Sequence, residues 1–229
     1  MIATALHFSG GKDSLACLYM YRHRWKDMYV VWLNTGSIYP EMQAYMDKWK
    51  SVLPHFVEVK TDQPGQIKAN GWPVDVLPVN NSALGMVISG NNAPLMQPYT
   101  SCCAANIWFP LHEATLKLGV TEVIKGQRNS DEFKSVARNG TEFQGLTYIM
   151  PIQDWSTDEV FKYLNEVGAE LAPGYSDGEK TGRDCWDCTA FLGDNKQRIE
   201  NLPIDRKMEI KRRLGIIKKS IEDQWKWID

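Results

Sequence analysis

The chain has 229 residues, of which 43% are hydrophobic and 24% are charged, and its formal net charge is -2. This length and composition fit one large domain, or one domain with a small lobe, and they exclude disordered and fibrous proteins. No stretch approaches the roughly 18 uninterrupted apolar residues of a membrane span. The N-terminal residues run into a strand pattern and lack the features of a signal peptide, so we expect a cytoplasmic protein without a membrane partner.

The first sixty residues alternate strand and helix patterns. Short apolar runs predict strands at 3–8, 28–33 and 55–59. Helices are expected to begin near Asp13 and at Pro40, because apolar residues recur at helical spacing after both positions. Units of this length in alternation favour an α/β fold with a doubly wound, mostly parallel sheet.

The middle of the chain is less regular. Residues 61–101 contain five prolines, so any helices there must be short. We interpret this stretch as an insertion that covers the substrate, although a plain surface excursion fits equally well. Regular patterns return with a helix at 105–118 and a strand at 122–125, and Ser156 and Glu159 are spaced as a capping box that opens a helix.

The pattern changes again beyond Pro173. A Gly-rich loop is followed there by a Cys pair and by two or three amphipathic helices. We therefore predict a main α/β domain at 1–172, and a small C-terminal helical lobe at 173–229 that packs on it and carries the Cys pair.

The first predicted strand leads through a Gly-rich turn into the first helix. The turn consists of Ser9, Gly10, Gly11, Lys12, Asp13 and Ser14. Glycines let backbone N–H groups approach phosphate oxygens, and the helix N-terminus adds partial positive charge. Lys12 supplies a point charge, and Asp13 indicates a helix cap or a Mg²⁺ contact. The spacing excludes a Walker A loop, but a simple turn with a helix cap remains an alternative.

These residues resemble a known superfamily. The turn is similar to the SGG-x-D-S motif of the PP-loop ATP pyrophosphatases, also called adenine nucleotide α-hydrolases. Three more segments resemble the sulfonucleotide (APS and PAPS) reductase branch. Residues 33–41 resemble the "DTG…PE" segment at the end of a strand, and residues 126–128 resemble the "G-x-R" turn. Residues 151–156 resemble the "P-L-x-D-W" segment that leads into a helix. Asn34 stands where that branch usually has an acid. The resemblance implies an adenine nucleotide α-hydrolase-like fold.

The same resemblance implies a set of site residues. ATP or a related adenine nucleotide would bind to residues 9–14 together with Thr35 and Gly36. Lys12, Asp13 and Arg128 would act in catalysis. Arg128 would clamp a second anionic group with its planar guanidinium, and an ion pair with Asp131 or Glu132 is the alternative. His7, just before the turn, is expected to be a strand residue and not a general base.

Four of the five cysteines form two pairs, Cys102-Cys103 and Cys185-x-x-Cys188, about eighty residues apart. Disulfides are not expected in a reducing compartment, so metal binding or catalysis is favoured. Adjacent cysteines suit a tetrahedral zinc site poorly. The arrangement resembles the assimilatory APS reductases, where four such thiolates hold a [4Fe–4S] cluster. Zinc and unliganded redox thiols remain open. Cys17 is interpreted as a small buried hydrophobe.

Two features differ from the reductases. Their nucleophilic cysteine lies in a C-terminal Glu-Cys-Gly-type tail, whereas no cysteine follows Cys188 in this sequence. Their phosphate loop is usually degenerate, whereas this one is intact. The combination resembles the ATP-dependent thiolating enzymes, so we expect ATP-dependent adenylation and sulfur transfer with Mg²⁺. The alternatives are a sulfonucleotide reductase that uses a partner's thiol, and a non-catalytic nucleotide-binding or redox-sensing protein.

The expected partners follow from this chemistry. A sulfur donor, or a protein that donates thiols or electrons, must supply the second reactant. The acceptor is open between nucleic acid, a small metabolite and a sulfonucleotide, and the small net charge argues weakly against extended nucleic-acid contact. A homodimer is also open.

The cysteine assignment makes a direct prediction. Protein that is purified without oxygen should be brown, with broad visible absorbance, because the four thiolates would hold an iron–sulfur cluster. An absorbance spectrum and the iron and zinc contents check this. A colourless protein with stoichiometric zinc would contradict the assignment.

Overall fold

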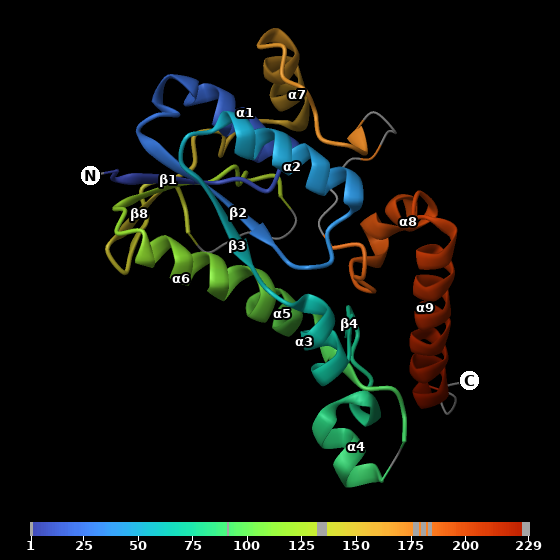
Figure 1. The fold of residues 1–229 in the computed structure, drawn as a ribbon. Coiled ribbons are helices and arrows are strands. Elements are labelled where there is room, and N and C mark those ends of the chain that lie inside the picture. Colours follow the sequence, from blue (N-terminus) through green and yellow to red (C-terminus); the bar gives the residue numbers. More distant parts are fainter. Residues whose placement is uncertain are drawn as a thin grey trace. The chain divides into compact units, whose positions relative to one another are not determined.

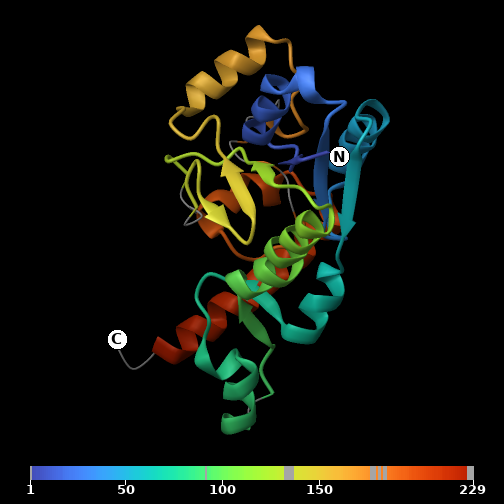
Figure 2. The same ribbon diagram turned by 90° about the vertical axis from the view of Figure 1, so that its left-hand side faces the viewer.

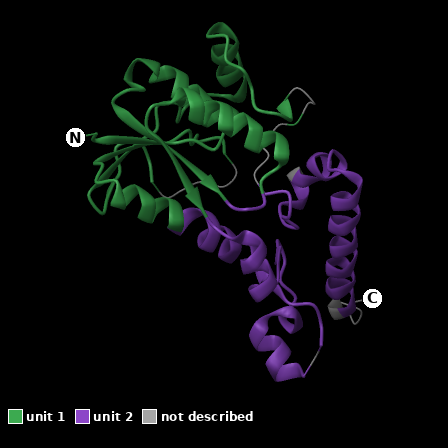
Figure 3. Ribbon diagram, in the orientation of Figure 1, with its two compact units in different colours: residues 1–34, 38–60, 110–184 green, residues 35–37, 61–109, 185–229 purple. Residues whose placement is uncertain are grey.

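The computed structural model describes residues 2–90, 92–131, 137–175, 179, 182 and 185–225 (Figures 1 and 2). The chain divides into two units (Figure 3). The first unit comprises residues 1–34, 38–60 and 110–184, and the second comprises 35–37, 61–109 and 185–229. This division differs from the predicted boundary at residue 172, because the C-terminal residues group with 61–109 and not by themselves.

The first unit is built on a six-stranded sheet with the strand order β3-β2-β1-β6-β8-β7. Its strands are β1 (Thr4–His7), β2 (Met28–Asn34), β3 (Phe56–Lys60), β6 (Glu122–Ile124), β7 (Glu142–Phe143) and β8 (Leu146–Ile149). Neighbouring strands pair in parallel, except that β7 and β8 form an antiparallel hairpin. The predicted α/β fold with a mostly parallel sheet is therefore confirmed.

Helices cover both faces of this sheet. They are α1 (Lys12–Met20), α2 (Pro40–Val52), α6 (Phe109–Lys117) and α7 (Thr157–Glu166), with a short 3-10 turn, η1 (Arg22–Arg24), after α1. Leu111 of α6 packs on a buried cluster from β1, β2, β6 and β8. The α1 and α2 helices lie on the opposite face (Figure 1), where the Phe8 ring meets Trp49 of α2 edge to face at 5.7 Å.

The strand order determines where a ligand can bind. From β1 the chain runs outward through β2 and β3 on one side, and it returns to form β6 on the other side of β1. The carboxyl ends of β1 and β6 therefore meet at a topological switch point, the usual ligand site of a doubly wound sheet. The residues that follow these two strands are the predicted phosphate loop and the segment that leads to Arg128.

The second unit contains short elements from 61–109 and two C-terminal helices. They are α3 (Gln63–Asn70), β4 (Trp72–Val74), η2 (Val79–Asn81), α4 (Ala83–Ser89), β5 (Met96–Pro98), α5 (Tyr99–Cys103), the π-helical segment η3 (Ala104–Trp108), α8 (Leu192–Glu200) and α9 (Ile204–Trp225). The strands β4 and β5 pair in parallel, and Val74, Met96 and Ile217 form a buried cluster. Among the described helices, none is both long and apolar enough to cross a membrane.

The predicted capping box at the start of α7 is confirmed. The Ser156 hydroxyl accepts the Glu159 N–H at 3.2 Å, and the Glu159 carboxylate accepts the Ser156 N–H at 2.7 Å. Two otherwise unpaired backbone donors are thereby satisfied. Because α7 packs on α1, the cap helps to hold the helix that follows the phosphate loop.

We expect Ser156→Ala to lower the free energy of unfolding by about 1 kcal/mol, because it removes the oxygen that caps α7. Urea denaturation measures this change. The Ser156→Thr variant keeps the hydroxyl and should lose much less. Equal losses in the two variants would show that the cap is not what stabilises the helix.

Candidate functional site

The predicted phosphate loop lies at the carboxyl end of β1. Gly10 has a φ of 81°, a conformation that side chains rarely adopt. A Cβ atom at Gly10 would lie 2.7 Å from Met46 Cε of α2. Gly11 is the N-cap of α1, which begins at Lys12. The sequence therefore forms the predicted strand, turn and helix, with backbone N–H groups at the helix N-terminus.

The segment after β6 packs directly on this helix start. A Cβ atom at Gly126 would lie 2.6 Å from both the Asp13 carbonyl carbon and the Ser14 nitrogen. Only a glycine allows so close an approach between the two backbones. Gly126 thereby brings Arg128 beside Asp13, although the two residues lie far apart in the sequence.

Three charged side chains form one network at the start of α1. Lys12 Nζ lies 2.7 Å from Asp13 Oδ2, and Arg128 Nε lies 2.9 Å from Asp13 Oδ1. The side chains of Lys12 and Arg128 are only 8% and 6% exposed, so water screens these charges little. The Nε–Oδ1 contact is an ion pair without hydrogen-bond alignment, because neither atom has a hydrogen-bond partner among the described residues.

Arg128 makes further contacts with protein groups. Its Nη2 lies 3.3 Å from Asp131 Oδ1, its Nη1 donates to Thr157 Oγ1 at 3.1 Å, and its backbone N–H donates to Asp131 Oδ2 at 2.8 Å. The ion pair with Asp131 is the alternative that the sequence left open, while Glu132 falls outside the described residues. Arg128 thus holds Asp13 in place, and its predicted contact with a second anionic group remains a prediction.

Both oxygens of Asp13 lie beside cations, so the carboxylate fixes Lys12 and Arg128 relative to α1. The expected contact of Asp13 with Mg²⁺ remains a prediction. Ser9 Oγ and Ser14 Oγ lie 3.2 Å apart on the same loop, so their hydroxyls are also held close to the helix start.

Tyr175 is a residue of this site that the sequence reasoning missed. Its hydroxyl accepts the backbone N–H of Lys12 at 3.0 Å. Its ring lies edge to face on Phe161 of α7, with the ring centroids 5.9 Å apart. The preceding Pro173 and Gly174 indicated a turn, but no pattern in the sequence linked that turn to the phosphate loop.

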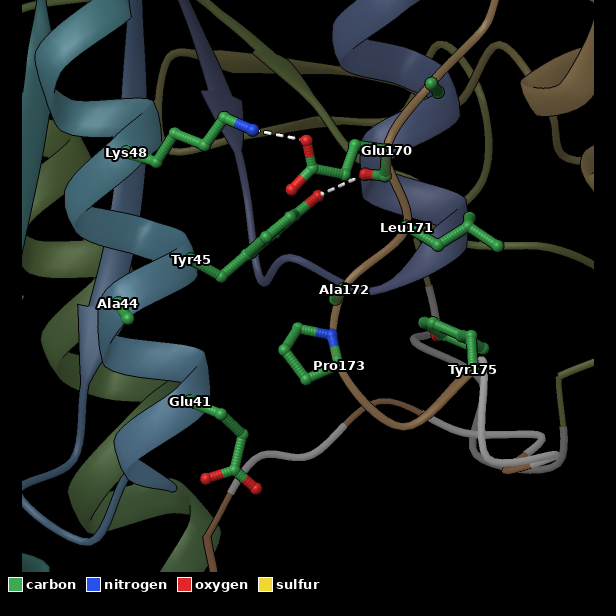
Figure 4. A pocket seen from close by; sticks show the side chains of 10 residues that line it. Glu41, Ala44, Tyr45, Lys48, Glu170, Leu171, Ala172, Pro173 and Tyr175 are labelled. Atoms are coloured by element: carbon green, nitrogen blue, oxygen red, sulfur yellow. Dashed lines mark hydrogen bonds and ion pairs between the residues drawn. The ribbon is translucent and has the colours of Figure 1, made fainter.

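A pocket of about 720 Å³ lies between α2 and residues 169–175 (Figure 4). Tyr175 forms part of its lining. On the α2 side, Tyr45 donates from its hydroxyl to the Glu170 carbonyl at 3.0 Å, and Lys48 pairs with the Glu170 carboxylate. Burial raises the pKa of Tyr45, so this phenol remains a donor at neutral pH.

Thr35 and Gly36 belong to the second unit, whereas the phosphate loop and Arg128 belong to the first. Thr35 is buried, and its Oγ1 lies 3.3 Å from the sulfur of Cys185. Its carbonyl accepts the Gln63 N–H at 2.9 Å. The side chain of Thr35 is therefore engaged with a cysteine, and its predicted nucleotide contact remains a prediction.

The two cysteine pairs also lie in the second unit. The buried Cys102 sulfur accepts the side-chain amides of Gln63 and Asn106, each at 3.7 Å. Desolvation raises the pKa of Cys102, and it raises the pKa of Cys188 to about 11, where the charge of Cys102 adds to the rise. The free thiols of Cys102 and Cys188 thus stay protonated at neutral pH.

The donor set fits a thiolate-ligated cluster in its chemistry, because it offers sulfur ligands and amide N–H groups that point at sulfur. In the part of the chain that the structure describes, however, no three Cys, His, Asp or Glu side chains are grouped closely enough to hold a metal ion. The assignment of Cys102, Cys103, Cys185 and Cys188 to a [4Fe–4S] cluster therefore remains a prediction.

The fifth cysteine, Cys17, is fully buried on α1. Burial raises the pKa of its thiol far above the usual range, and the charge of Asp13 raises it further. Since the thiolate is the reactive form, Cys17 is inert at neutral pH. The interpretation of this residue as a small buried hydrophobe is confirmed.

The family model of the phosphoadenosine phosphosulfate reductase domain matches residues 3–191. No curated protein matches the sequence. Among solved structures, the chain is similar to the phosphoadenylyl-sulfate (PAPS) reductase from Candida auris, with a TM-score of 0.56 and 17% identity over 81% of this chain and 82% of that chain. At this identity the likeness establishes the fold alone.

Another similar structure is the U34-tRNA thiolase NcsA from Methanococcus maripaludis with its [4Fe–4S] cluster. Its TM-score is 0.48, with 13% identity over 95% of this chain and 71% of that chain. The NH3-dependent NAD synthetase from Campylobacter jejuni has a TM-score of 0.47, with 13% identity over 93% of this chain and 84% of that chain.

His7 lies half-buried beside the loop and is neutral. Its Nε2 lies 2.8 Å from Thr115 Oγ1, which itself donates to the Leu111 carbonyl at 2.7 Å. Nε2 must therefore carry the proton, while Nδ1 has no partner among the described residues. Burial lowers the pKa of His7 to about 3, and the charge of Lys125 adds to this shift. A general base is not expected from such an imidazole.

We expect His7 to make the fold sensitive to acid. Its pKa is about 3 in the folded chain and 6.5 in the unfolded chain, so only the unfolded chain binds a proton between these values. The contribution of His7 to the free energy of unfolding is therefore fully present above pH 6.5. It falls by up to about 1.4 kcal/mol per pH unit as the pH is lowered toward 3. Urea denaturation between pH 7 and pH 4 should show a shallower loss for His7→Gln than for the wild type.

The exposed His23 provides the matched control. His23→Gln should keep the pH dependence of the wild type. If the free energy of unfolding of His7→Gln falls with pH as steeply as that of the wild type and of His23→Gln, His7 is not the group that takes up the proton.

Proposed function

The chain belongs to the phosphoadenosine phosphosulfate reductase domain family, and we propose that it uses this fold to bind ATP and to transfer sulfur to an adenylated acceptor. In this proposal, the phosphates of ATP bind at the loop formed by residues 9–14. The acceptor is a molecule with a carbon–oxygen bond that adenylation can activate, such as a nucleic-acid base or a small metabolite.

The observation that carries this proposal is the buried cation at the N-terminus of α1. Lys12 is held there by Asp13, while Arg128 holds Asp13 from the other side. A ligand must compete with the Asp13 carboxylate for Lys12. A ligand that carries several linked negative charges is therefore favoured. The triphosphate of ATP has them, and the helix N-terminus adds its own attraction for phosphate.

The proposed reaction has two steps. An oxygen of the acceptor bonds to the α-phosphorus of ATP, the bond from that phosphorus to the bridging oxygen breaks, and pyrophosphate leaves. A sulfur donor at the oxidation level of hydrosulfide then attacks the activated carbon, the carbon–oxygen bond breaks, and AMP leaves with that oxygen while a proton is released. No net oxidation or reduction occurs. Lys12 and the loop N–H groups stabilise the charge on the departing pyrophosphate.

The residues of the second unit have a separate role in this proposal. Cys102, Cys103, Cys185 and Cys188 would hold a [4Fe–4S] cluster, which supplies an iron site for the incoming sulfur when it is bound. The amides of Gln63 and Asn106 would donate to the Cys102 sulfur, an interaction that tunes such clusters. Mg²⁺ would enter with the phosphates of ATP, and Asp13 would be its candidate protein ligand once a phosphate has taken Lys12.

A second candidate function is a sulfonucleotide reductase, which the family match itself favours. Reduction of a sulfonucleotide requires a thiolate that attacks the sulfur. Cys17 is the only thiol of this sequence outside the two pairs, and its burial keeps it protonated. The attacking thiol would therefore belong to a partner protein.

We expect Lys12→Ala to weaken ATP binding by roughly 10- to 100-fold, because it removes a charge-assisted contact to phosphate worth about 1.5–3 kcal/mol. Titration calorimetry with ATP measures the dissociation constants. Lys48→Ala is the matched control, because Lys48 is an exposed lysine of the same unit that pairs with Glu170, and its affinity should equal that of the wild type. Wild-type affinity in a folded Lys12→Ala protein would contradict the phosphate-loop assignment.

A further inference from the structure

Two backbone donors of the phosphate loop are occupied by side-chain oxygens in this structure. The Gly11 N–H donates to Ser9 Oγ at 3.3 Å, and the Lys12 N–H donates to the Tyr175 hydroxyl at 3.0 Å. Backbone N–H groups at the start of a helix have no partner within the helix, which is why they bind phosphate. A phosphate that binds here must therefore replace acceptors that are already in place.

The two acceptors, Ser9 and Tyr175, come from different parts of the sequence. Ser9 belongs to the loop itself, whereas Tyr175 follows Lys12 by 163 residues. Its hydroxyl lies 3.5 Å from the position of a Cβ atom on Gly11 and 3.7 Å from that on Gly182. The phenol oxygen thus lies beside two glycines, in the position in front of the Lys12 N–H that a bound phosphate oxygen would take.

We propose that Tyr175 competes with the ligand for the Lys12 N–H, and that a phosphate group displaces its hydroxyl when it binds. This inference rests on the proposed binding of phosphates to the loop. One N–H donates strongly to one acceptor in line with it, so the phenol oxygen and a phosphate oxygen cannot both hold this donor. A ligand without a phosphate at this position leaves Tyr175 in place.

The surroundings of Tyr175 allow such a displacement. The residue lines the pocket beside α2, which has a volume of about 720 Å³. Figure 4 shows Tyr175 at the end of the lining segment remote from Lys48. The phenol ring thus borders open space, into which a displaced hydroxyl would move. This movement requires the side chain to swing at its Cα–Cβ bond, so it also changes the edge contact of the ring with Phe161.

The proposal predicts the sign of a substitution. Tyr175→Phe keeps the ring but removes the competing acceptor, so the Lys12 N–H is unpaired until a phosphate binds. Phosphate binding should then become about five-fold tighter, which corresponds to the net value of one hydrogen bond. If the Tyr175 hydroxyl instead donated to a bound phosphate, the same substitution would weaken binding.

The test is titration calorimetry of the wild type, Tyr175→Phe and Tyr45→Phe with inorganic tripolyphosphate and with ATP. Tyr45 is the matched control, because its phenol lines the same pocket but donates to Glu170. We expect tighter binding of both ligands by Tyr175→Phe and wild-type affinity for Tyr45→Phe. Equal or weaker binding of tripolyphosphate by Tyr175→Phe would overturn the proposal, as would a lack of tripolyphosphate binding by all three proteins.

The two proposals fail in different ways. If ATP binds the wild type no more tightly than tripolyphosphate does, the adenine-nucleotide function fails. The ratio of the tripolyphosphate affinities of Tyr175→Phe and the wild type still tests the role of Tyr175. Hydrogen exchange of the Lys12 amide provides a second measurement. The amide should exchange faster in free Tyr175→Phe than in the free wild type, and equal exchange would count against the proposal.

Discussion

The candidate site depends on the ion pairs that hold the Asp13 carboxylate between Lys12 and Arg128. It lies at the start of α1, where the helix N-terminus already favours negative charge. Without Asp13, two buried cations would face each other at the switch point of the sheet. Asp13 balances one of these charges, and Asp131, which pairs with Arg128, balances the other, so a polyanionic ligand must take Lys12 from Asp13. Gly126 makes the arrangement feasible, because any side chain there would collide with the backbone of α1.

The two chemistries implied by the sequence are carried by different units. The phosphate loop belongs to the first unit with the six-stranded sheet, and the cysteine pairs belong to the second. Thr35 follows β2 in sequence but belongs to the second unit, where its hydroxyl contacts Cys185.

The local parts of this site were predictable from the sequence, and the distant contacts were not. The strand, turn and helix of residues 3–14 form a continuous pattern, so the loop could be recognised before its structure was known. The hairpin of β7 and β8 was missed, because β7 has only two residues and its turn, at Gln144 and Gly145 with positive φ, leaves a weak signal. Tyr175 and the grouping of 61–109 with 185–229 depend on packing between residues far apart in the chain.

A competition titration of anaerobically purified protein with ATP and with phosphoadenosine phosphosulfate tests the central claim most directly. The intact loop with its buried Lys12 predicts that ATP binds more tightly and displaces the sulfonucleotide. Tighter binding of phosphoadenosine phosphosulfate would contradict the sulfur-transfer proposal, and it would favour a reductase that takes its thiol from a partner protein.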